Sequence, residues 1–511
     1  MSDPSRRFRV LFAASEVAGF AKTGGLADVC AALPRALARR GHQVAVALPL
    51  YYRVRHSSHH LTPTGIIFTI PLGHRSLPGR IWRTTLPESD VPVYLVEQPE
   101  LFERDDPAHG NSLYNFSAPG GRKEDYGDNA ERFIFFCRAI MEALPKLDVK
   151  PEILHCNDWQ TGLLPAYLKE LYARSSHLHA SAYHGIRTLL TIHNIAYQGN
   201  FPASAMAATG LHQRLFNHRQ LEFYGNLSFL KSGCVFADRL STVSPRYAEE
   251  IQTMVFGYGL EGLLGDRRDV LNGIVNGVDY DEWDPRNDKL IAATYDDETV
   301  FERKPANKSA LQAAFGLPQR PEVPLLGVVA RLAEQKGISL ITESAWELLS
   351  HDVQLIVLGD GDPMYHHQFE QIRSRFPQKC GIYLGFNERL AHQVEAGADI
   401  FLMPSQFEPS GLNQLYSLRY GTVPVVRAVG GLYDTITDCT PETLAAGTAT
   451  GFRFGPYTPP AFQHAVHRAL ACYWQQKDVW RQLVQTGMRQ DWSWGRSATE
   501  YERLYGWMTG G

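Results

Sequence analysis

The chain has 511 residues and a mass of 57.3 kDa, which at roughly 100–200 residues per domain predicts two to four domains. Hydrophobic residues make up 44% and charged residues 20% of the sequence, a composition that excludes a disordered chain or a long coiled coil. The 50 Lys and Arg against 54 Asp and Glu give a net charge of −4. Because non-specific nucleic-acid binders carry a basic surplus, we expect no nucleic-acid partner.

The sequence shows no sign of export or of a membrane segment. Its seven cysteines are scattered and form no C-x-x-C pair, which argues against a zinc ribbon and against a disulfide framework. The N-terminus lacks an apolar signal core, and no window of 18 residues is continuously apolar. We therefore expect a reduced, cytoplasmic protein without a membrane partner.

Strand-like and helix-like stretches alternate along the chain. The first three are a strand over residues 9–14, a helix over 26–40 and a strand over 43–48. Further strands are expected at 153–156, 189–192, 325–330, 354–358, 382–384, 400–403 and 424–426, with helices at 339–349 and 412–420. Several of these strands are continuously apolar, as strands buried on both faces of a parallel sheet are. The pattern predicts an α/β protein of doubly wound domains.

The alternation stops over residues 276–324, where prolines and polar residues are frequent, and resumes at Leu325. We place the domain boundary there, with an N-terminal Rossmann-like domain over 1–275 and a second over 276–490. The final segment, 491–511, contains an aromatic, helix-like stretch that we expect to pack on the first domain. Two such domains facing one another would form a cleft, and open parallel sheets bind ligands beyond the carboxyl ends of their strands.

The first candidate anion site lies where the first strand gives way to a helix. Gly24 and Gly25 precede the helix, and Lys22 adds a mobile positive charge. Glycine permits close backbone approach, and the free N–H groups of a helix start attract anions. An ordinary strand–helix turn with a surface lysine is the equally weighted alternative, since no G-x-G-x-x-G fingerprint is present.

Two more strand–helix corners carry charged residues. Arg331 and Lys336 are five residues apart after a strand, a spacing that suits a diphosphate gripped by a guanidinium fork and an ammonium. Glu408 stands before a helix, where it could accept hydrogen bonds from vicinal sugar hydroxyls beside the bare amides near Gly411. The alternatives are a pair of solvated cations in the first case and a helix-capping acid in the second.

Polar residues also follow two buried strands. Asp158 could stabilise a cationic transition state, and His193 could hydrogen-bond a substrate; a satisfied structural group is the alternative for each. Asp360 and Asp362 resemble a metal-binding D-x-D, but their glycine- and proline-rich surroundings favour a turn. The three histidines within residues 172–187 have no cysteine nearby and lie in a turn-rich, polar stretch. We therefore expect a surface loop and no metal there.

Six segments occur in one order that resembles a known family. They are K-T-G-G-L-A-D-V at 22–29, H-C-N-D-W at 155–159, T-I-H-N-I-A-Y-Q-G at 191–199, N-G-V-D at 276–279, R-L-A-E-Q-K-G at 331–337 and F-E-P-S-G-L at 407–412. They look like the bacterial glycogen synthases and plant starch synthases that use ADP-glucose, and the resemblance covers about residues 8–505. It implies a GT-B glycosyltransferase, with two Rossmann-like domains facing a central cleft and a C-terminal helix on the first.

The activity implied by the resemblance is transfer of glucose from ADP-glucose to the non-reducing end of an α-1,4-glucan, with retention of configuration. No metal or other cofactor is implied. Catalytic roles fall on five residues, namely Asp158, His193, Arg331, Lys336 and Glu408. Substrate-binding roles fall on Lys22, Gly24, Gly25, Asp28, Tyr114, Asn194, Asn276, Phe386, Ser410, Gly411 and Leu412.

The resemblance also assigns these residues to parts of the substrates. Residues 22–28 would contact the donor, and residues 331–336 would neutralise its diphosphate. Glu408, with backbone amides of 410–412, would hold the glucose. Tyr114 would face the acceptor, while Phe386 would stack near the adenine.

The sequence departs from the family pattern at a few positions. Ser410 stands where some members carry Cys, and Tyr416 stands where many neighbouring transferases carry a second Glu. The second departure favours the glycogen and starch synthase branch. The motifs together offer no clear nucleophile for a double displacement, and the resemblance implies displacement on the same face. Two alternatives stay open: a UDP-glucose-dependent enzyme and a non-catalytic glucan-binding protein.

Overall fold

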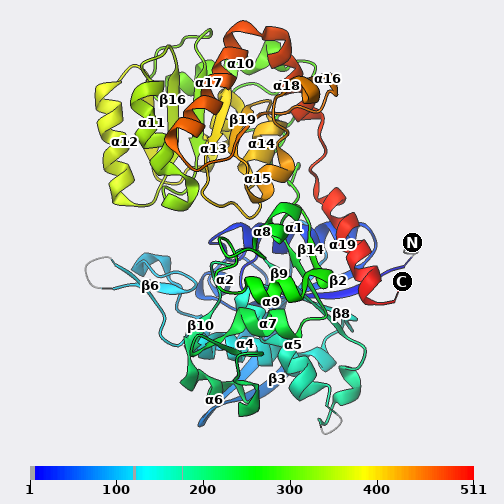
Figure 1. Ribbon diagram of the computed structural model, residues 1–511. Coiled ribbons are helices and arrows are strands. Elements are labelled where there is room, and N and C mark those ends of the chain that lie inside the picture. Colours follow the sequence, from blue (N-terminus) through cyan, green and yellow to red (C-terminus); the bar gives the residue numbers. More distant parts are fainter. Residues whose placement is uncertain (1–5, 119–121, 175–176, 511) are drawn as a thin grey trace. The chain divides into compact units, whose positions relative to one another are not determined.

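The computed structural model describes residues 6–118, 122–174 and 177–510, and the chain forms two compact units (Figure 1). The first unit comprises Met1–Val243, Ala248–Gly277 and Trp494–Gly511. The second comprises Ser244–Tyr247 and Val278–Ser493. The chain therefore leaves the first unit after Gly277 and returns to it at Trp494.

The first unit is built on a nine-stranded sheet in the order β14-β13-β9-β8-β1-β2-β5-β4-β3. Its strands are β1 (Arg9–Ala13), β2 (Gln43–Pro49), β3 (Thr62–Leu72), β4 (Arg75–Thr85), β5 (Pro92–Glu97), β8 (Ile153–Asn157), β9 (Arg187–Ile192), β13 (Arg239–Thr242) and β14 (Leu271–Gly273). Neighbouring strands are parallel except β3 with β4 and β4 with β5. The strand order reverses direction between β1 and β8, which pair in parallel with Val10 opposite Ile153.

Helices cover this sheet, and the last of them comes from the C-terminal end of the chain. The longer helices are α1 (Gly25–Arg39), α4 (Asn129–Ala143), α7 (Phe229–Phe236) and α19 (Trp494–Met508). Helix α19, red in Figure 1, packs against α1. Its Tyr505 hydroxyl lies 2.9 Å from Nδ1 of His155 in β8. The predicted return of the C-terminal helix to the first domain is confirmed.

The second unit has a six-stranded, wholly parallel sheet in the order β17-β16-β15-β18-β19-β20. Its strands are β15 (Leu325–Val329), β16 (Gln354–Gly359), β17 (Cys380–Leu384), β18 (Ile400–Met403), β19 (Val423–Arg427) and β20 (Phe452–Phe454). Its helices are α10 (Val300–Ala314), α11 (Ile338–Leu348), α12 (Pro363–Arg375), α13 (Glu388–Gly397), α14 (Asn413–Arg419), α15 (Gly430–Thr435), α16 (Pro441–Ala445), α17 (Pro459–Gln475) and α18 (Lys477–Arg489). The strand order reverses between β15 and β18.

The α/β, doubly wound architecture is thus confirmed in both units. Leu326, Val328, Leu355 and Val425 line the core of the second unit and are nearly inaccessible to solvent, as expected for strands buried on both faces. No helix in the described part of the chain is long and apolar enough to cross a membrane. Each of the seven cysteines, all within the described residues, is a free thiol.

Candidate active site

Several of the predicted site residues lie at the two points where strand order reverses. In the first unit, Lys22 follows β1 and Asp158 follows β8. In the second unit, Arg331 and Lys336 follow β15, and Glu408 follows β18. In open parallel sheets the loops after adjacent strands diverge at such a switch point, which leaves a crevice for a ligand.

A buried carboxylate that the sequence did not reveal holds the loop before α1. Glu16 is 4% exposed and accepts hydrogen bonds from the Thr23 backbone N–H at 2.5 Å, from its hydroxyl at 2.6 Å and from the Gly24 N–H at 3.2 Å. Gly24 and Gly25 face open space, since a Cβ on either would meet nothing within 4 Å. The loop is therefore fixed from behind while the start of α1 stays open to a ligand.

Lys22 and Asp28, both predicted to contact the donor, contact each other. The Lys22 ammonium lies 2.6 Å from Oδ1 of Asp28. Burial raises the pKa of Asp28, and the ammonium partly opposes that rise. Lys22 is exposed, so it can exchange Asp28 for a bound anion. Until then Asp28, one turn into the helix, holds the ammonium near the start of α1.

Tyr114 belongs to the same group of side chains. Its hydroxyl donates to Oε1 of Glu16 at 2.8 Å and lies 2.8 Å from the Ser15 hydroxyl. Its backbone carbonyl accepts from the Tyr126 N–H at 3.0 Å and from the Asn129 amide at 2.9 Å. The predicted acceptor residue is thus joined to the loop that precedes α1.

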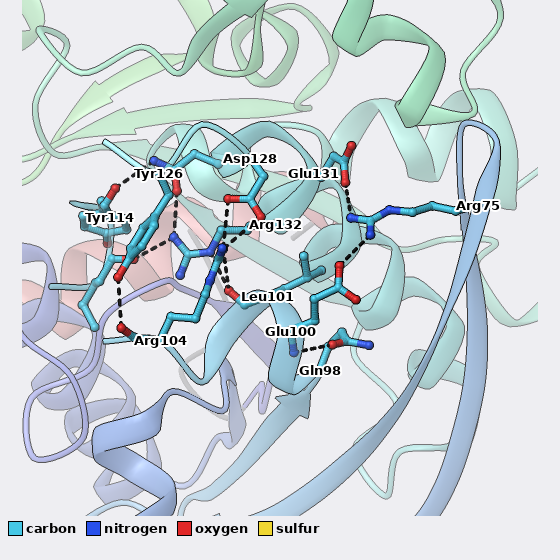
Figure 2. Close-up of polar contacts among 12 residues, drawn as sticks. Arg75, Gln98, Glu100, Leu101, Arg104, Tyr114, Tyr126, Asp128, Glu131 and Arg132 are labelled. Carbon is cyan, nitrogen blue, oxygen red and sulfur yellow. Dashed lines mark hydrogen bonds and ion pairs between the residues drawn. The ribbon is translucent and has the colours of Figure 1, made fainter. Parts of the chain in front are cut away.

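A buried arginine supports the segment that carries Tyr114, as Figure 2 shows. Arg132 is fully buried in α4 and donates to the carbonyls of Leu101 and Leu113, at 2.7 and 2.8 Å, and to the Asn129 amide oxygen at 2.7 Å. Burial lowers the pKa of its guanidinium. The planar Arg132 guanidinium, bonded to these three acceptors, therefore fixes the backbone before and after the segment that carries Tyr114.

Asp158 has a strained backbone at the carboxyl end of β8. Its φ of 56° lies in the left-handed region that non-glycine residues seldom adopt. The carboxylate accepts a hydrogen bond from the His193 backbone N–H at 2.7 Å. Burial raises the pKa of Asp158 to about 7, although the N–H groups of His193 and Asn194 oppose the rise. This carboxylate therefore titrates near neutral pH.

His193 is neutral, and its tautomer follows from its neighbour. Burial lowers the pKa of His193 to about 3. The Asn157 amide nitrogen donates to the Ala13 carbonyl at 3.1 Å, so its amide oxygen faces His193 Nε2 at 3.0 Å. Since that oxygen can only accept, Nε2 carries the proton and Nδ1 is the ring's acceptor.

In the second unit, the predicted cation and carboxylate form a pair. Lys336 Nζ lies 2.6 Å from Oε2 of Glu408, which is 5% exposed, and the Ser405 hydroxyl donates to the same oxygen at 3.1 Å. Arg331 is exposed and donates to Oε1 of Gln335 at 3.2 Å. The Glu408 carboxylate is therefore held in place, while the Arg331 guanidinium keeps donors for a ligand.

The backbone around Glu408 is packed too tightly for side chains at nearby glycines. A Cβ on Gly337, where φ is 69°, would lie 2.0 Å from the Pro404 carbonyl oxygen. A Cβ on Gly431 would lie 2.0 Å from the carbonyl oxygen of Ser410, and the Gly431 N–H donates to the Glu408 carbonyl at 3.1 Å. The start of α15 therefore packs closely against the 410–412 loop that precedes α14.

The sequence also missed a link across the switch point of the second unit. The Asn413 amide donates to the carbonyl of Val329, the last residue of β15, at 2.7 Å. This contact ties the start of α14 to the end of the neighbouring strand. The only sequence feature that could have indicated this contact is an Asn two residues after Gly411 at a helix start. An ordinary helix-capping Asn occurs in the same position, so the contact could not be inferred.

The side chains of three predicted binding residues make no hydrogen bond or ion pair with the other predicted site residues in the described part of the chain. Asn194 accepts from the Ala196 N–H within its own loop at 3.0 Å. Asn276 is buried near the end of the first unit, and its amide oxygen has no hydrogen-bond partner among the described residues. Phe386 is 87% exposed, a state in which its ring is available for stacking.

The D-x-D resemblance is explained by a turn. Asp362 caps α12, with its side chain accepting from the Met364 N–H at 2.8 Å. Asp360 lies 3.2 Å from His366 Nε2. Two groups of three possible metal ligands occur among the described residues, Glu347 with His351 and His467, and Glu282 with Glu388 and His392. Neither includes an aspartate of this turn.

Comparisons with known proteins identify the family. Residues 9–266 match the family model of the starch synthase catalytic domain, and residues 312–482 match that of glycosyl transferases group 1. The chain is 47% identical to glycogen synthases of Anaeromyxobacter sp. and Syntrophotalea carbinolica, over 97% of this chain and 98% of each relative.

Solved structures give the same result. The catalytic domain of starch synthase IV from Arabidopsis thaliana, bound to ADP and acarbose, superposes with a TM-score of 0.87 at 31% identity, covering 99% of this chain and all of that one. A sucrose-phosphate synthase from Thermosynechococcus elongatus shares the fold at a TM-score of 0.56 and 16% identity. The chain belongs to the glycogen and starch synthase family of GT-B glycosyltransferases.

Proposed function

We propose that this chain transfers glucose from ADP-glucose to the non-reducing end of an α-1,4-glucan, with retention of configuration and release of ADP. The observation that carries the proposal is the Lys336–Glu408 pair, at 2.6 Å, at the switch point of the second sheet. Arg331 lies at the same strand end. The glycogen synthase relatives and the ADP bound to the starch synthase IV structure support it.

The second unit binds the donor in this proposal. Departure of ADP places negative charge on the diphosphate, and Arg331 and Lys336 stabilise that charge through charge-assisted hydrogen bonds. Glu408 accepts hydrogen bonds from the glucose hydroxyls, assisted by the backbone amides of 410–412. Phe386, exposed on its loop, stacks on the adenine. These contacts need no cofactor and no metal.

The first unit supplies the groups near the anomeric carbon. As the bond to ADP breaks, positive charge develops on the sugar, and the Asp158 carboxylate stabilises it. His193 faces the glucosyl group as a neutral imidazole. Asn194 and Asn276 contribute polar contacts. Lys22, with Gly24, Gly25 and Asp28, contacts the donor from the start of α1.

Tyr114 faces the glucan acceptor, and Glu16 fixes its ring beside the donor loop. Because the predicted site residues offer no clear nucleophile for a double displacement, we favour attack by the acceptor hydroxyl on the face from which ADP leaves. A cytoplasmic location completes the proposal, since seven free thiols suit a reducing compartment.

Initial rates of glucosyl transfer to glycogen, measured with ADP-glucose and UDP-glucose side by side, test this function. We expect ADP-glucose to give the higher kcat/KM and the rate to be unchanged in excess chelator. A preference for UDP-glucose would assign the alternative donor. Binding of glycogen without turnover of either donor would show a glucan-binding protein, and a strict metal requirement would refute the charge role of Arg331 and Lys336.

A further inference from the structure

A group of three metal-ligand side chains lies on the second unit, outside the proposed reaction site. Glu347 is in the last turn of α11, His351 follows the end of that helix, and His467 is in α17, which packs against α11. Nε2 of His351 lies 3.0 Å from Oε1 of Glu347, and Nε2 of His467 lies 2.9 Å from the same oxygen. Two imidazoles and one carboxylate therefore converge on one point.

The geometry of this group departs from that of a simple hydrogen-bonded cluster. Although His467 Nε2 is 2.9 Å from the carboxylate, it makes no hydrogen bond, and the atom is buried. The second carboxylate oxygen, Oε2 of Glu347, is also buried and has no hydrogen-bond partner among the described residues. A buried polar atom without a partner is costly, and a cation between the three side chains would satisfy both atoms.

We propose that Glu347, His351 and His467 bind one divalent transition-metal ion of the zinc type, with water at the remaining position. Histidine nitrogens and a carboxylate oxygen are a usual zinc donor set, at about 2.0–2.2 Å from the ion. Tetrahedral bonds of that length separate ligand atoms by roughly 3.4 Å. The three ligand atoms already lie within 4.8 Å of one another, so small side-chain shifts complete the site.

Two features of the fold bear on a cation at this place. The carboxyl end of α11 carries partial negative charge, which attracts a positive ion. The Lys379 ammonium donates to the carbonyls of Leu349 and His351, at 2.9 and 2.6 Å. That lysine fixes the backbone of His351 before the metal arrives, while its positive charge offsets part of the attraction from the helix end.

The ion joins α11 to α17 and takes no part in glucosyl transfer. Helix α11 starts directly after Lys336 and Gly337, and at 1.5 Å per residue the metal group lies roughly 15 Å farther along it. We therefore expect the metal to raise the melting temperature by at least about 3 °C at saturation and to leave kcat unchanged.

Calorimetric titration of the untagged, chelator-stripped full chain with zinc chloride tests the site. We expect one zinc per chain and no heat of binding from magnesium or calcium chloride, since both ions prefer oxygen ligands. His351→Gln and His467→Gln should each weaken zinc binding by at least about tenfold. The matched control is His464→Gln, an exposed histidine on the same helix α17, which should bind zinc like the wild type.

Absence of zinc uptake by the wild-type chain would overturn the proposal. Uptake that is equal in the wild type and in both ligand variants would overturn it too, because the zinc would then be bound elsewhere. Far-ultraviolet circular dichroism and glucosyl transfer rates, both expected to match the wild type, show that the variants are folded.

Discussion

At the scale of single residues, Asp158 makes the sharpest prediction. A carboxyl group with a pKa of about 7 is protonated below neutral pH, and only its ionised form can stabilise positive charge on the sugar. We expect kcat/KM to fall as the pH drops through about 7. Asp158→Asn should lower kcat by about 100-fold and remove this acid limb. Initial rates from pH 5 to 9 measure both effects.

His193→Gln is the matched control for Asp158, because the two residues are hydrogen-bonded neighbours but titrate far apart. With a pKa of about 3, His193 does not change charge between pH 5 and 9, so its variant should keep the acid limb. A limb that survives in Asp158→Asn and disappears in His193→Gln would contradict the assignment. The raised pKa also means that ionisation of Asp158 costs folding stability, which is lost as pH rises from about 4 to 7.

Substitutions of Lys336 and Glu408 should have non-additive effects on kcat. Lys336→Ala and Glu408→Gln are each expected to lower kcat by about 100-fold, since each removes a contact made in the transition state. The two groups are 2.6 Å apart, so the two substitutions should be coupled. We expect the kcat of the double variant to be at least about fivefold higher than the two single losses multiplied together would give. A full double-mutant cycle of initial rates measures this coupling.

Calorimetric titration with ADP separates the two roles. Glu408→Gln should change ADP affinity by less than about 1 kcal/mol, while Lys336→Ala should weaken it more. Ser405→Ala, which removes the other donor to Oε2 of Glu408, should cost less than tenfold in kcat. Equal losses of ADP affinity and rate in Glu408→Gln would assign that residue to the nucleotide pocket or the fold.

The sequence indicated these charged residues because each stands directly after an apolar strand. That position places Arg331, Lys336 and Glu408 at one sheet edge, whichever way their side chains turn. It could not predict that Lys336 and Glu408 pair, since they are separated by the whole of β16, β17 and β18. Glu16 was missed for a related reason: a buried carboxylate that binds its own loop leaves no periodic or spacing signal.

At the scale of elements, Arg132 makes a prediction about stability. Arg132→Met leaves the carbonyls of Leu101 and Leu113 and the Asn129 amide oxygen without their donor in a buried place. We expect the free energy of unfolding of the first unit to fall by at least about 3 kcal/mol. The KM for glucan should rise, because the segment carrying Tyr114 loosens. Urea denaturation and acceptor kinetics measure the two effects.

Arg75→Met is the matched control, also visible in Figure 2. Arg75 bridges Glu100 and Glu131 at 2.5 Å each, but its side chain is 35% exposed. Solvent screens such pairs, so the control should cost less than about 1 kcal/mol. Equal costs for the two variants would show that Arg132 acts as a surface cation does.

The elements themselves were largely predictable where they are buried on both faces. Strands such as β15 and β18 end within one residue of the predicted ranges because a continuous apolar run stops at a polar or turn residue. The long antiparallel pair β3 and β4 was not predicted. One face of each strand is partly exposed, so apolar and polar residues mix along it, and Pro63, Pro71 and Pro78 read as turns.

The surface loop predicted over residues 172–187 contains two buried aromatic side chains. Tyr172 and Tyr183 are buried, and their hydroxyls donate to Glu142 and to the Met141 carbonyl, at 2.7 and 2.8 Å. His177 packs against both rings. Composition indicated turns correctly, but it could not show that two aromatic side chains anchor the segment to α4.

At the scale of the whole molecule, the first unit is completed by the end of the chain. Helix α19 brings Tyr505 to His155 of β8, whose Nε2 lies 2.6 Å from the Thr191 hydroxyl of β9. That hydroxyl lies 2.6 Å from the hydroxyl of Ser241 in β13. This buried row of hydrogen bonds therefore connects the last helix with three strands of the sheet.

A fragment comparison tests whether the first unit depends on α19. Residues 1–277 alone should lack a cooperative melting transition or melt at least about 10 °C lower than the same residues joined to 494–511. A short Gly-Ser linker suffices for the joined form, because a Cβ on Gly277 would lie 2.6 Å from Cα of Trp494. Residues 278–493, which hold the continuous part of the second unit, should fold alone. Melting curves of the three proteins, followed by circular dichroism, measure this dependence. Equal melting temperatures for the first two proteins would show that α19 covers a sheet that is already stable. The hydrogen bonds that join Tyr505 to His155 and Thr191 would then be dispensable for folding.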